Sequence, residues 1–301
     1  DPIHPAGVAR IGASHALISD RTQATVLVIR TSPLSEAMIA ASPALKLIVK
    51  HGAGVDNIPI PACTARGIIV ANTPGGNNST AVAEGAVTLM LAVLRRVRAM
   101  DALVREGRWD ERWSVRLRDL TGAKLGLIGF GRIARQVAKI CGAGFGAEVA
   151  AYDPMVSASE MAALGVIPLD LPDIMARDVI SIHTPLTPQT RNLIGAAELA
   201  MMHTQAVIVN SSRGGIIDEA ALFAALQSGA IGGAGIDVFD VEPPPADHPL
   251  FTLPNVVLSP HVAGVTEASM KAMALAVADV IDSMAANQPL ATLLNPEVLA
   301  Q

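Results

Sequence analysis

Three polar residues could together carry out acid–base chemistry, because each comes shortly after an apolar run of the sequence. Arg213 ends "VIVNSSR", Glu242 ends "GAGIDVFDVE" and His261 ends "NVVLSPH". A guanidinium group can hold a carboxylate through two parallel hydrogen bonds. A carboxylate beside an imidazole fixes the tautomer of the ring and favours its protonated form, which makes the ring a usable proton donor. Taken singly, each residue is as well explained as a surface group or a structural partner.

The apolar runs are the elements that must position these residues. Nine of them alternate with segments of helical length: "TVLVIR", "LKLIVK", "GIIVAN", "KLGLIG", "AEVAAYD", "DVISIH", "AVIVN", "GAGIDV" and "NVVLS". Such runs indicate parallel strands covered by helices on both faces, so the fold class is predicted to be α/β. Ligands of open α/β sheets bind beyond the carboxyl ends of the strands. Arg213, Glu242 and His261 are therefore expected at one edge of one sheet.

A glycine-rich turn follows the fourth run and is typical of a nucleotide site. "KLGLIGFGRIARQVAKI" places Gly129, Gly131 and Ala134 between a strand and an amphipathic helix. Small residues there permit a tight turn and let a pyrophosphate approach the helix N-terminus. Asp153 ends the next strand, 24 residues after Gly129 (153 − 129), near the offset of an acid that binds adenosine ribose. Its carboxylate would repel a 2′-phosphate, which favours NAD over NADP. The alternative is a structural turn followed by an incidental aspartate.

Composition limits the partners and the location of the chain. The 301 residues suffice for two packed domains, and the net charge of −5 with no block of Lys and Arg argues against nucleic acid. The longest apolar run, residues 86–94, is too short to cross a bilayer, so no membrane partner is expected. Cys63 and Cys141 lack metal-ligand spacing, which predicts no metal site and favours a reducing cytoplasm.

Two longer helical patterns interrupt the alternation. A stretch over residues 80–107 follows the first three strands and is interpreted as a helical connector between domains. A final helix is predicted over residues 267–286 and is expected to return to the first domain. His4, His15, His203 and His248 have no accompanying motif, so they are predicted to be structural or solvated.

The motifs "GFGRIA" with "YDP", "NSSRGGIIDEAAL", "DVFDVEP" and "SPHVAG" resemble the D-isomer-specific 2-hydroxyacid dehydrogenase family in order and spacing, and the likeness covers nearly the whole chain. The resemblance implies two doubly wound parallel-sheet domains, with a Rossmann NAD-binding domain (residues 96–267) inserted into a flavodoxin-like substrate domain (residues 1–95 and 268–301). It implies that Arg213 orients the substrate, that His261 is the acid/base and that Glu242 supports His261. It also implies a homodimer, whose interface Trp109 and Trp113 could anchor.

The resemblance assigns further residues to the cofactor and the substrate. The main-chain amides of Ala53 and Gly54 in "KHGAGVDN" would bind the substrate carboxylate. Lys50 and His51 precede that loop and are candidates for tuning the choice of substrate. Ala53 stands where some members carry Thr or Val, which puts a nicotinamide-side contact there in doubt. The implied cofactor-binding residues are Gly129, Gly131, Arg132, Ile133, Asp153, Thr184, Pro185, Ser211, Asp237, Gly264 and Thr80.

The sequence thus predicts an NAD-dependent oxidoreductase of class EC 1.1.1.-. It would transfer a hydride between nicotinamide and a small D-2-hydroxy acid or the matching 2-oxo acid. Substrates such as 3-phosphoglycerate, hydroxypyruvate and glyoxylate remain open, as does the physiological direction. The alternative is an NAD-sensing, corepressor-like binding protein on the same fold, which would bind NAD without rapid turnover.

Overall fold

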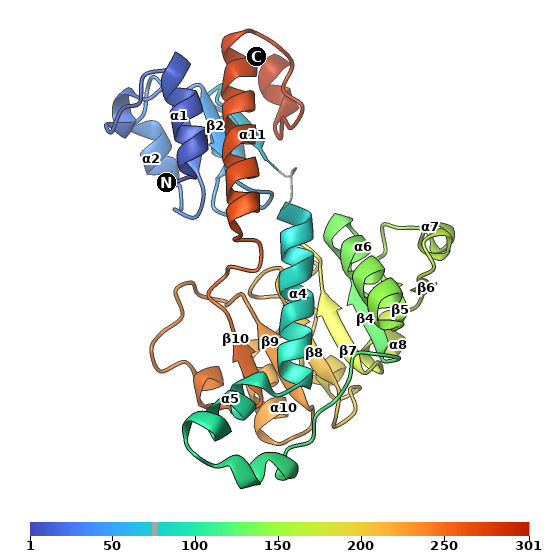
Figure 1. Cartoon of the computed structure of the whole chain (residues 1–301). Helices are drawn as coiled ribbons and strands as arrows, with labels where there is room; N and C mark the ends of the chain where they lie inside the picture. The colour runs from blue at the N-terminus through green and yellow to red at the C-terminus, as the bar shows by residue number, and fades with distance from the viewer. Residues whose placement is uncertain (74–77, 301) are drawn as a thin grey trace. The chain divides into compact units, whose positions relative to one another are not determined.

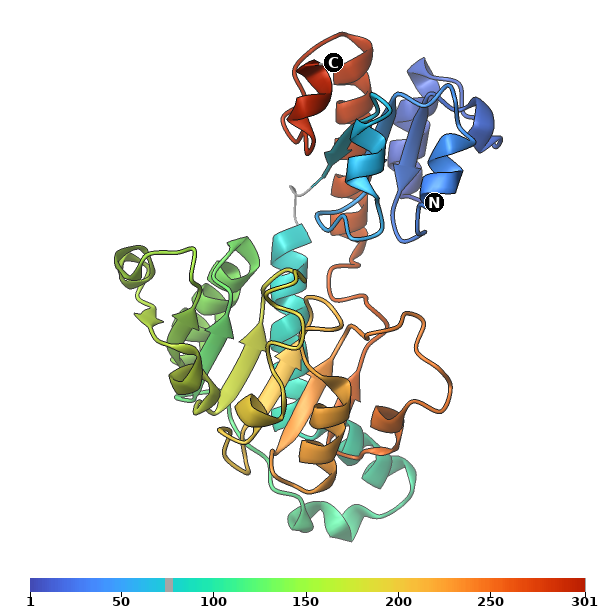
Figure 2. The same cartoon turned by 180° about the vertical axis from the view of Figure 1, so that it is seen from behind.

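The computed structural model describes residues 1–73 and 78–300, and the chain forms two compact units, each built on a parallel sheet (Figures 1 and 2). The small-sheet unit comprises Asp1–Ala81 and Val265–Gln301, and the large-sheet unit comprises Val82–Gly264. One unit is therefore inserted in the sequence of the other, and the α/β class is confirmed. The predicted domain limits fall after residues 95 and 267, whereas the compact units change after residues 81 and 264.

The small-sheet unit has three parallel strands in the order β1-β2-β3, with bounds Val26–Ile29, Leu47–Lys50 and Ile69–Asn72. Its helices are α1 (Pro5–Ser14), α2 (Glu36–Ala40), α3 (Ile60–Thr64) and α11 (Glu267–Ala285). Successive side chains of a strand point to opposite faces. In β2, Leu47 and Val49 pack with Val277 of α11, while Ile48 packs with Ile39 of α2. Helices thus cover both faces of this sheet.

The large-sheet unit has seven parallel strands in the order β10-β9-β8-β7-β4-β5-β6. Their bounds are β4 Lys124–Ile128, β5 Glu148–Tyr152, β6 Ile167–Pro168, β7 Val179–Ile182, β8 Val207–Asn210, β9 Gly233–Ile236 and β10 Val256–Leu258. The order reverses between β4 and β7, because the chain proceeds outward from β4 on one side and from β7 on the other. Such a reversal point is where α/β sheets bind ligands beyond their carboxyl ends.

Helices cover both faces of the large sheet as well. Its helices are α4 (Asn78–Leu94, which begins in the small-sheet unit), α5 (Val97–Arg105), α6 (Arg132–Lys139), α7 (Ala158–Ala163), α8 (Leu171–Met175), α9 (Ala196–Leu199) and α10 (Glu219–Gln227). Helix α4 lies over one face of this sheet (Figure 1), where Met90 of α4 is buried with Leu127 of β4 and Val209 of β8. The other face buries Ile208 of β8 with Leu222 of α10. Because α4 packs on this sheet from Ala83 onward, the compact unit includes residues that the sequence assigns to the first domain.

The predicted elements agree with the structure except at two places. All nine predicted strands and the final helix are confirmed, but the short strand β6 was missed. The single helix predicted over 80–107 is wrong: α4 and α5 are separate, because Arg96 adopts a left-handed backbone with φ of 48°. The Arg96 guanidinium donates to the Gly232 carbonyl (3.1 Å), which ties this corner to the sheet. Among residues 1–73 and 78–300, the helices are too short or too polar to span a membrane.

Candidate active site

The three residues that the sequence singles out meet at the carboxyl edge of the large sheet. Arg213 follows β8, Glu242 follows β9 and His261 follows β10, and these three strands are neighbours (Figure 2). His261 Nδ1 lies 2.7 Å from Glu242 Oε2. Arg213 is near enough to the Glu242 carboxyl for its positive charge to favour the ionised form. The expected convergence of these side chains is therefore present in the structure.

Glu242 is held in its charged form by its neighbours. Burial alone would raise the pKa of Glu242, but hydrogen bonds from the His261 ring and from the Phe239 amide (3.0 Å to Oε1) lower it, with help from the charge of Arg213. The net effect is a pKa below the ordinary value of 4.5. An ionised carboxylate only accepts hydrogen bonds, so His261 Nδ1 must carry the proton. Its Nε2 is then the ring atom left to exchange a proton with a ligand.

His261 lies in a turn that Asp237 holds. The His261 backbone is left-handed, with φ of 56°, and its N–H donates to the Asp237 carbonyl (2.8 Å). The carboxylate of Asp237 accepts from Val262 N (2.9 Å to Oδ1) and Ala263 N (3.0 Å to Oδ2). Asp237 is only 1% exposed, so water has little access to replace these bonds. Both carboxylate oxygens of this predicted cofactor residue are thus engaged in shaping the turn.

The loop that carries Arg213 is fixed by Asn210, a residue that sequence reasoning did not assign. Asn210 Oδ1 accepts from Ser212 N (3.0 Å) and Ser212 Oγ (2.8 Å), and its Nδ2 donates to the Arg213 carbonyl (2.8 Å). The asparagine side chain thereby closes the turn immediately after β8, as asparagine does when it bonds its own backbone two residues on. The signal was available, because an Asn followed by two serines ends the apolar run.

The glycine turn after β4 lies at the reversal point of the sheet. Gly129 has φ of +88°, and a Cβ there would lie 2.7 Å from the His183 carbonyl oxygen and 3.0 Å from Thr184 N. Only glycine fits that backbone and that approach. Gly131 precedes α6, and a Cβ on it would meet no atom within 4 Å. There is therefore room for a ligand beside Gly131, and the positive end of the helix that follows favours an anion there.

Asp153 holds the glycine turn, a role that was not predicted for it. Its Oδ2 accepts from Phe130 N in the glycine turn (2.8 Å), and its Oδ1 accepts from Met155 N (2.8 Å). A carboxylate has about four acceptor positions, so two remain for ribose hydroxyls. Ser211, at the end of β8, is buried, and its Oγ makes no hydrogen bond with the described residues. The open cradle at Gly131, the remaining acceptors of Asp153 and this unsatisfied hydroxyl fit a bound dinucleotide.

The other predicted cofactor residues lie along the same edge or in the small-sheet unit. Thr184 and Pro185 follow β7, Arg132 and Ile133 form the first turn of α6, and Gly264 ends the large-sheet unit. His183, just before Thr184, has its pKa lowered to about 4 by burial, and its Nε2 lies 2.9 Å from Ser181 Oγ.

The predicted carboxylate loop belongs to the small-sheet unit. It begins after β2, where Thr73 Oγ1 accepts from Gly52 N (2.9 Å) and the Ala53 carbonyl accepts from Asn72 Nδ2 (2.9 Å). Gly54 follows in this loop, and Thr80 lies in the first turn of α4. The Lys50 ammonium donates to Asn57 Oδ1 (2.6 Å). These contacts give the loop a fixed shape within its own unit.

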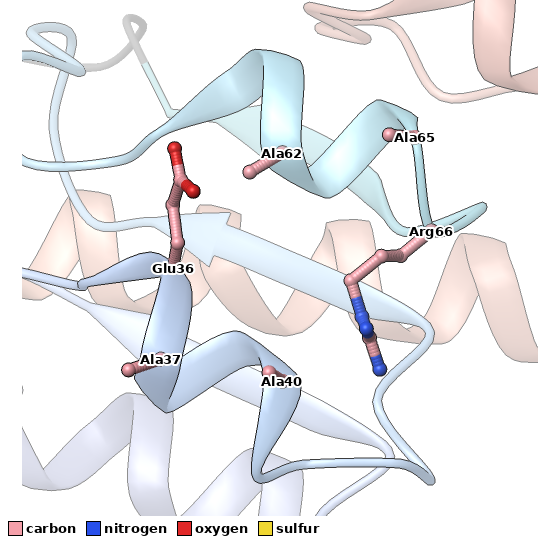
Figure 3. A pocket seen from close by; sticks show the side chains of 6 residues that line it. All are labelled: Glu36, Ala37, Ala40, Ala62, Ala65 and Arg66. Carbon is pink, nitrogen blue, oxygen red and sulfur yellow. The ribbon is translucent and has the colours of Figure 1, made fainter.

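A hollow on the small-sheet unit is lined by none of the site residues named above. It opens between α2 and α3, and Figure 3 shows Glu36 of α2 directed toward α3, and Arg66 on the opposite side. The remaining lining residues are Ala37, Ala40, Ala62 and Ala65. The lining holds no imidazole, thiol or hydroxyl, so it offers no acid–base pair comparable with that of the large sheet.

Comparison with known proteins agrees with the motifs. Residues 87–263, more than half of the chain, match the family model described as "D-isomer specific 2-hydroxyacid dehydrogenase, NAD binding domain". A D-3-phosphoglycerate dehydrogenase of Archaeoglobus fulgidus is 40% identical over 93% of this chain and 53% of its own length. A glyoxylate reductase of Korarchaeum cryptofilum is 38% identical over 89% of this chain and 82% of its own. The chain spans about half the length of the phosphoglycerate dehydrogenases that it matches.

A solved structure extends the likeness to the fold. The NADPH-dependent glyoxylate/hydroxypyruvate reductase of Sinorhizobium meliloti, determined with NADP and malonate, superposes with a TM-score of 0.86 at 29% identity. The alignment covers 99% of this chain and 95% of that one. The two-sheet architecture is therefore shared over the whole length.

Proposed function

Because the chain belongs to the D-isomer specific 2-hydroxyacid dehydrogenase family, we propose that it transfers a hydride between a nicotinamide nucleotide and a small D-2-hydroxy acid or its 2-oxo acid. The observation that carries this proposal is the pairing of His261 Nδ1 with the ionised Glu242 carboxylate beside Arg213. A 2-oxo acid needs a cation for its carboxylate and a proton donor for its carbonyl oxygen. The three side chains supply both at one edge of a nucleotide-binding sheet.

The residues divide the reaction between them. Arg213 holds the substrate carboxylate and carbonyl through its guanidinium group. His261 gives a proton from Nε2 to the carbonyl oxygen in reduction and takes it back in oxidation. Glu242 stabilises the imidazolium and holds the proton on Nδ1. NAD, when bound, supplies or accepts the hydride at the substrate carbon. The amides at Gly131 and Arg132 would hold its pyrophosphate, and Asp153 its ribose.

The cofactor is proposed to be NAD rather than NADP. Asp153 is fixed by two main-chain amides at the end of β5, so its charge cannot easily move away from the adenosine ribose. A 2′-phosphate at that position would meet a like charge. A solved structure similar to this chain is of an NADPH-dependent reductase, so the proposed preference for NAD rests on Asp153 and not on the overall fold.

A spectrophotometric screen tests the function. Oxidation of NADH and NADPH is followed in parallel with glyoxylate, hydroxypyruvate and phosphohydroxypyruvate. We expect turnover of at least one acid with NADH, and a preference for NADH over NADPH. A protein that binds NADH but turns over none of the acids would instead fit the corepressor-like alternative.

We also propose that the protein is a homodimer formed through its tryptophans. Trp109 and Trp113 of η2 (Trp109–Ser114) are the two tryptophans of the sequence, and they are 60% and 83% exposed. The Arg112 guanidinium lies 5.1 Å and 4.8 Å from their centres. Such aromatic and arginine side chains are enriched in protein interfaces. Light scattering should give twice the chain mass for the wild type and a monomer for Trp113→Ala, while Leu164→Ala, at another exposed apolar site, should remain dimeric.

A cytoplasmic location stays a prediction.

A further inference from the structure

We propose that Glu219, Asp240 and His248 form a brace that positions Arg213 relative to the Glu242–His261 pair. The term "brace" denotes these three side chains. The proposal rests on the proposed function, because it assigns the three residues a role in placing the groups of that reaction. None of them was expected to act: His248 had no accompanying motif, and the two acids were unassigned.

The brace is a continuous chain of hydrogen bonds. Gly215 N donates to Asp240 Oδ1 (2.5 Å), Asp240 N donates to Glu219 Oε1 (2.9 Å), and Glu219 Oε2 lies 3.1 Å from His248 Nε2. Gly215 is two residues beyond Arg213, and Asp240 is two residues before Glu242. The bond between Gly215 and Asp240 therefore joins the two loops that carry the proposed carboxylate binder and the proposed partner of the acid.

The two loops also touch through their backbones. A Cβ on Gly214 would lie 1.9 Å from the Phe239 carbonyl oxygen, so no side chain fits between the loops at this point. Phe239 N in turn donates to Glu242 Oε1 (3.0 Å). The separation of the Arg213 loop from Glu242 is thus set by direct backbone contact, and the Gly215–Asp240 bond holds the loops together.

The far end of the brace is anchored in packed structure. Leu250 N donates to His248 Nδ1 (3.3 Å), so that nitrogen carries no proton and Nε2 must donate to Glu219. His248 is buried, and its ring packs 5.4 Å from Phe239 and 5.3 Å from Phe251 between ring centres. The histidine therefore fixes Glu219 in one orientation, and Glu219 fixes the backbone of Asp240.

The charge of Asp240 is influenced by burial and by the groups around the brace. Burial raises the pKa of Asp240 first, and the carboxylates of Glu219 and Asp218 raise it further, whereas the Gly215 amide and Arg191 oppose the rise. Neighbouring carboxylates disfavour one another's ionised form unless hydrogen-bond donors stabilise it. The donors here are the amide of the Arg213 loop and the ring of His248. Because a 1 Å displacement of a substrate-positioning group can lower a rate by about 100-fold, loss of these donors should be visible in turnover.

The test compares Asp240→Ala with Asp240→Asn, which keeps an acceptor oxygen for Gly215 N. Asp247→Ala, an exposed aspartate in the same loop, is the matched control. We expect Asp240→Ala to lower kcat for the 2-oxo acid at least tenfold, with the Kd for NADH within twofold of wild type. Asp240→Asn should recover most of the loss, and the control should behave as wild type. Glu219→Gln, whose single amide oxygen can accept from Asp240 N or from His248 Nε2–H but not from both, should give an intermediate loss.

A double-mutant comparison separates positioning from general damage. In a His261→Ala background Asp240→Ala should cause little further loss, because residues that act through one unit are not additive. Hydrogen exchange should rise in residues 211–217 and 238–242. If the wild type turns over a 2-oxo acid and Asp240→Ala does so at a rate within twofold of it, the brace is refuted and the proposed function is not. The same holds if Asp240→Ala lowers kcat by the same factor in the wild-type and His261→Ala backgrounds. Absence of wild-type turnover with every acid overturns the proposed function and the positioning role with it.

Discussion

Replacing Asp237 by asparagine tests how the turn at His261 is held. The Asp237 carboxylate accepts from the amides of Val262 and Ala263, and the main-chain carbonyl of Asp237 accepts from His261 N. Asparagine keeps one acceptor oxygen and turns the other into an NH2 group that faces an N–H. One hydrogen bond is therefore lost and a donor is placed against a donor.

The magnitude follows from the strain that the turn must hold. A left-handed backbone at a residue other than glycine costs roughly 1–2 kcal/mol, and His261 has φ of 56°. A hydrogen bond to a charged group contributes about 1.5–3 kcal/mol. The free energy lost with one such bond is as large as the cost of the left-handed backbone, so His261 should leave the left-handed conformation in much of the population. Since about 1.4 kcal/mol corresponds to tenfold, we expect kcat to fall about 10- to 100-fold.

Steady-state kinetics and NADH binding distinguish the two roles open to Asp237. If it positions His261, kcat falls and the Kd for NADH stays within about twofold. If it contacts the nicotinamide, as the resemblance implies, the Kd rises. Asp247→Asn is the control, because Asp247 is an exposed carboxylate outside the turn that carries His261. An unchanged kcat for Asp237→Asn would refute the positioning argument.

Three further predictions use other contacts. Gly85→Ala should lower both stability and kcat, because the new Cβ would lie 2.7 Å from the Ala263 carbonyl oxygen; Gly12→Ala, whose Cβ would meet its nearest atom at 3.4 Å, should instead stabilise by about 0.5–1 kcal/mol in urea unfolding. His183 takes up a proton near pH 6.5 when unfolded but near 4 when folded, so stability should fall as pH drops from 6.5 toward 4, by at most about 3 kcal/mol, and His183→Gln should flatten that dependence; an unaltered pH profile would count against the burial of the ring. Asp153→Ala should raise the Kd for NADH and reduce the ratio of the NADPH Kd to the NADH Kd, both measured by fluorescence titration. An equal rise in both Kd values would indicate that only the glycine turn was damaged.

Strands and the proposed acid–base pair could be predicted because local patterns specify them. Buried parallel strands are continuous apolar runs, and nine of these were correct. Parallel strands deliver the residues that follow them to one edge, which is why Arg213, Glu242 and His261 could be grouped without any contact being known. The missed strand β6 is two residues long and ends in a proline, so it has no run to detect.

Features that depend on one backbone angle or on distant partners could not be predicted. The break at Arg96 has no glycine or proline to mark it, and the carbonyl that its side chain binds lies 136 residues away in the sequence. The role of Asp237 depends on amides that enter only when β10 lies beside β9. His248 and Glu219 are 29 residues apart, and they pair only because the fold brings them together, not because of any motif.

The most direct test of the account is the rate of 2-oxo acid reduction by the wild type, His261→Ala and Glu242→Gln, with the enantiomer of the product determined. The account predicts a D-2-hydroxy acid from the wild type and a sharp loss of turnover for His261→Ala with little change in NADH affinity. For Glu242→Gln it predicts a smaller loss of kcat, because the amide can still accept from Nδ1 but no longer stabilises the charged ring. Wild-type rates in either variant would contradict it.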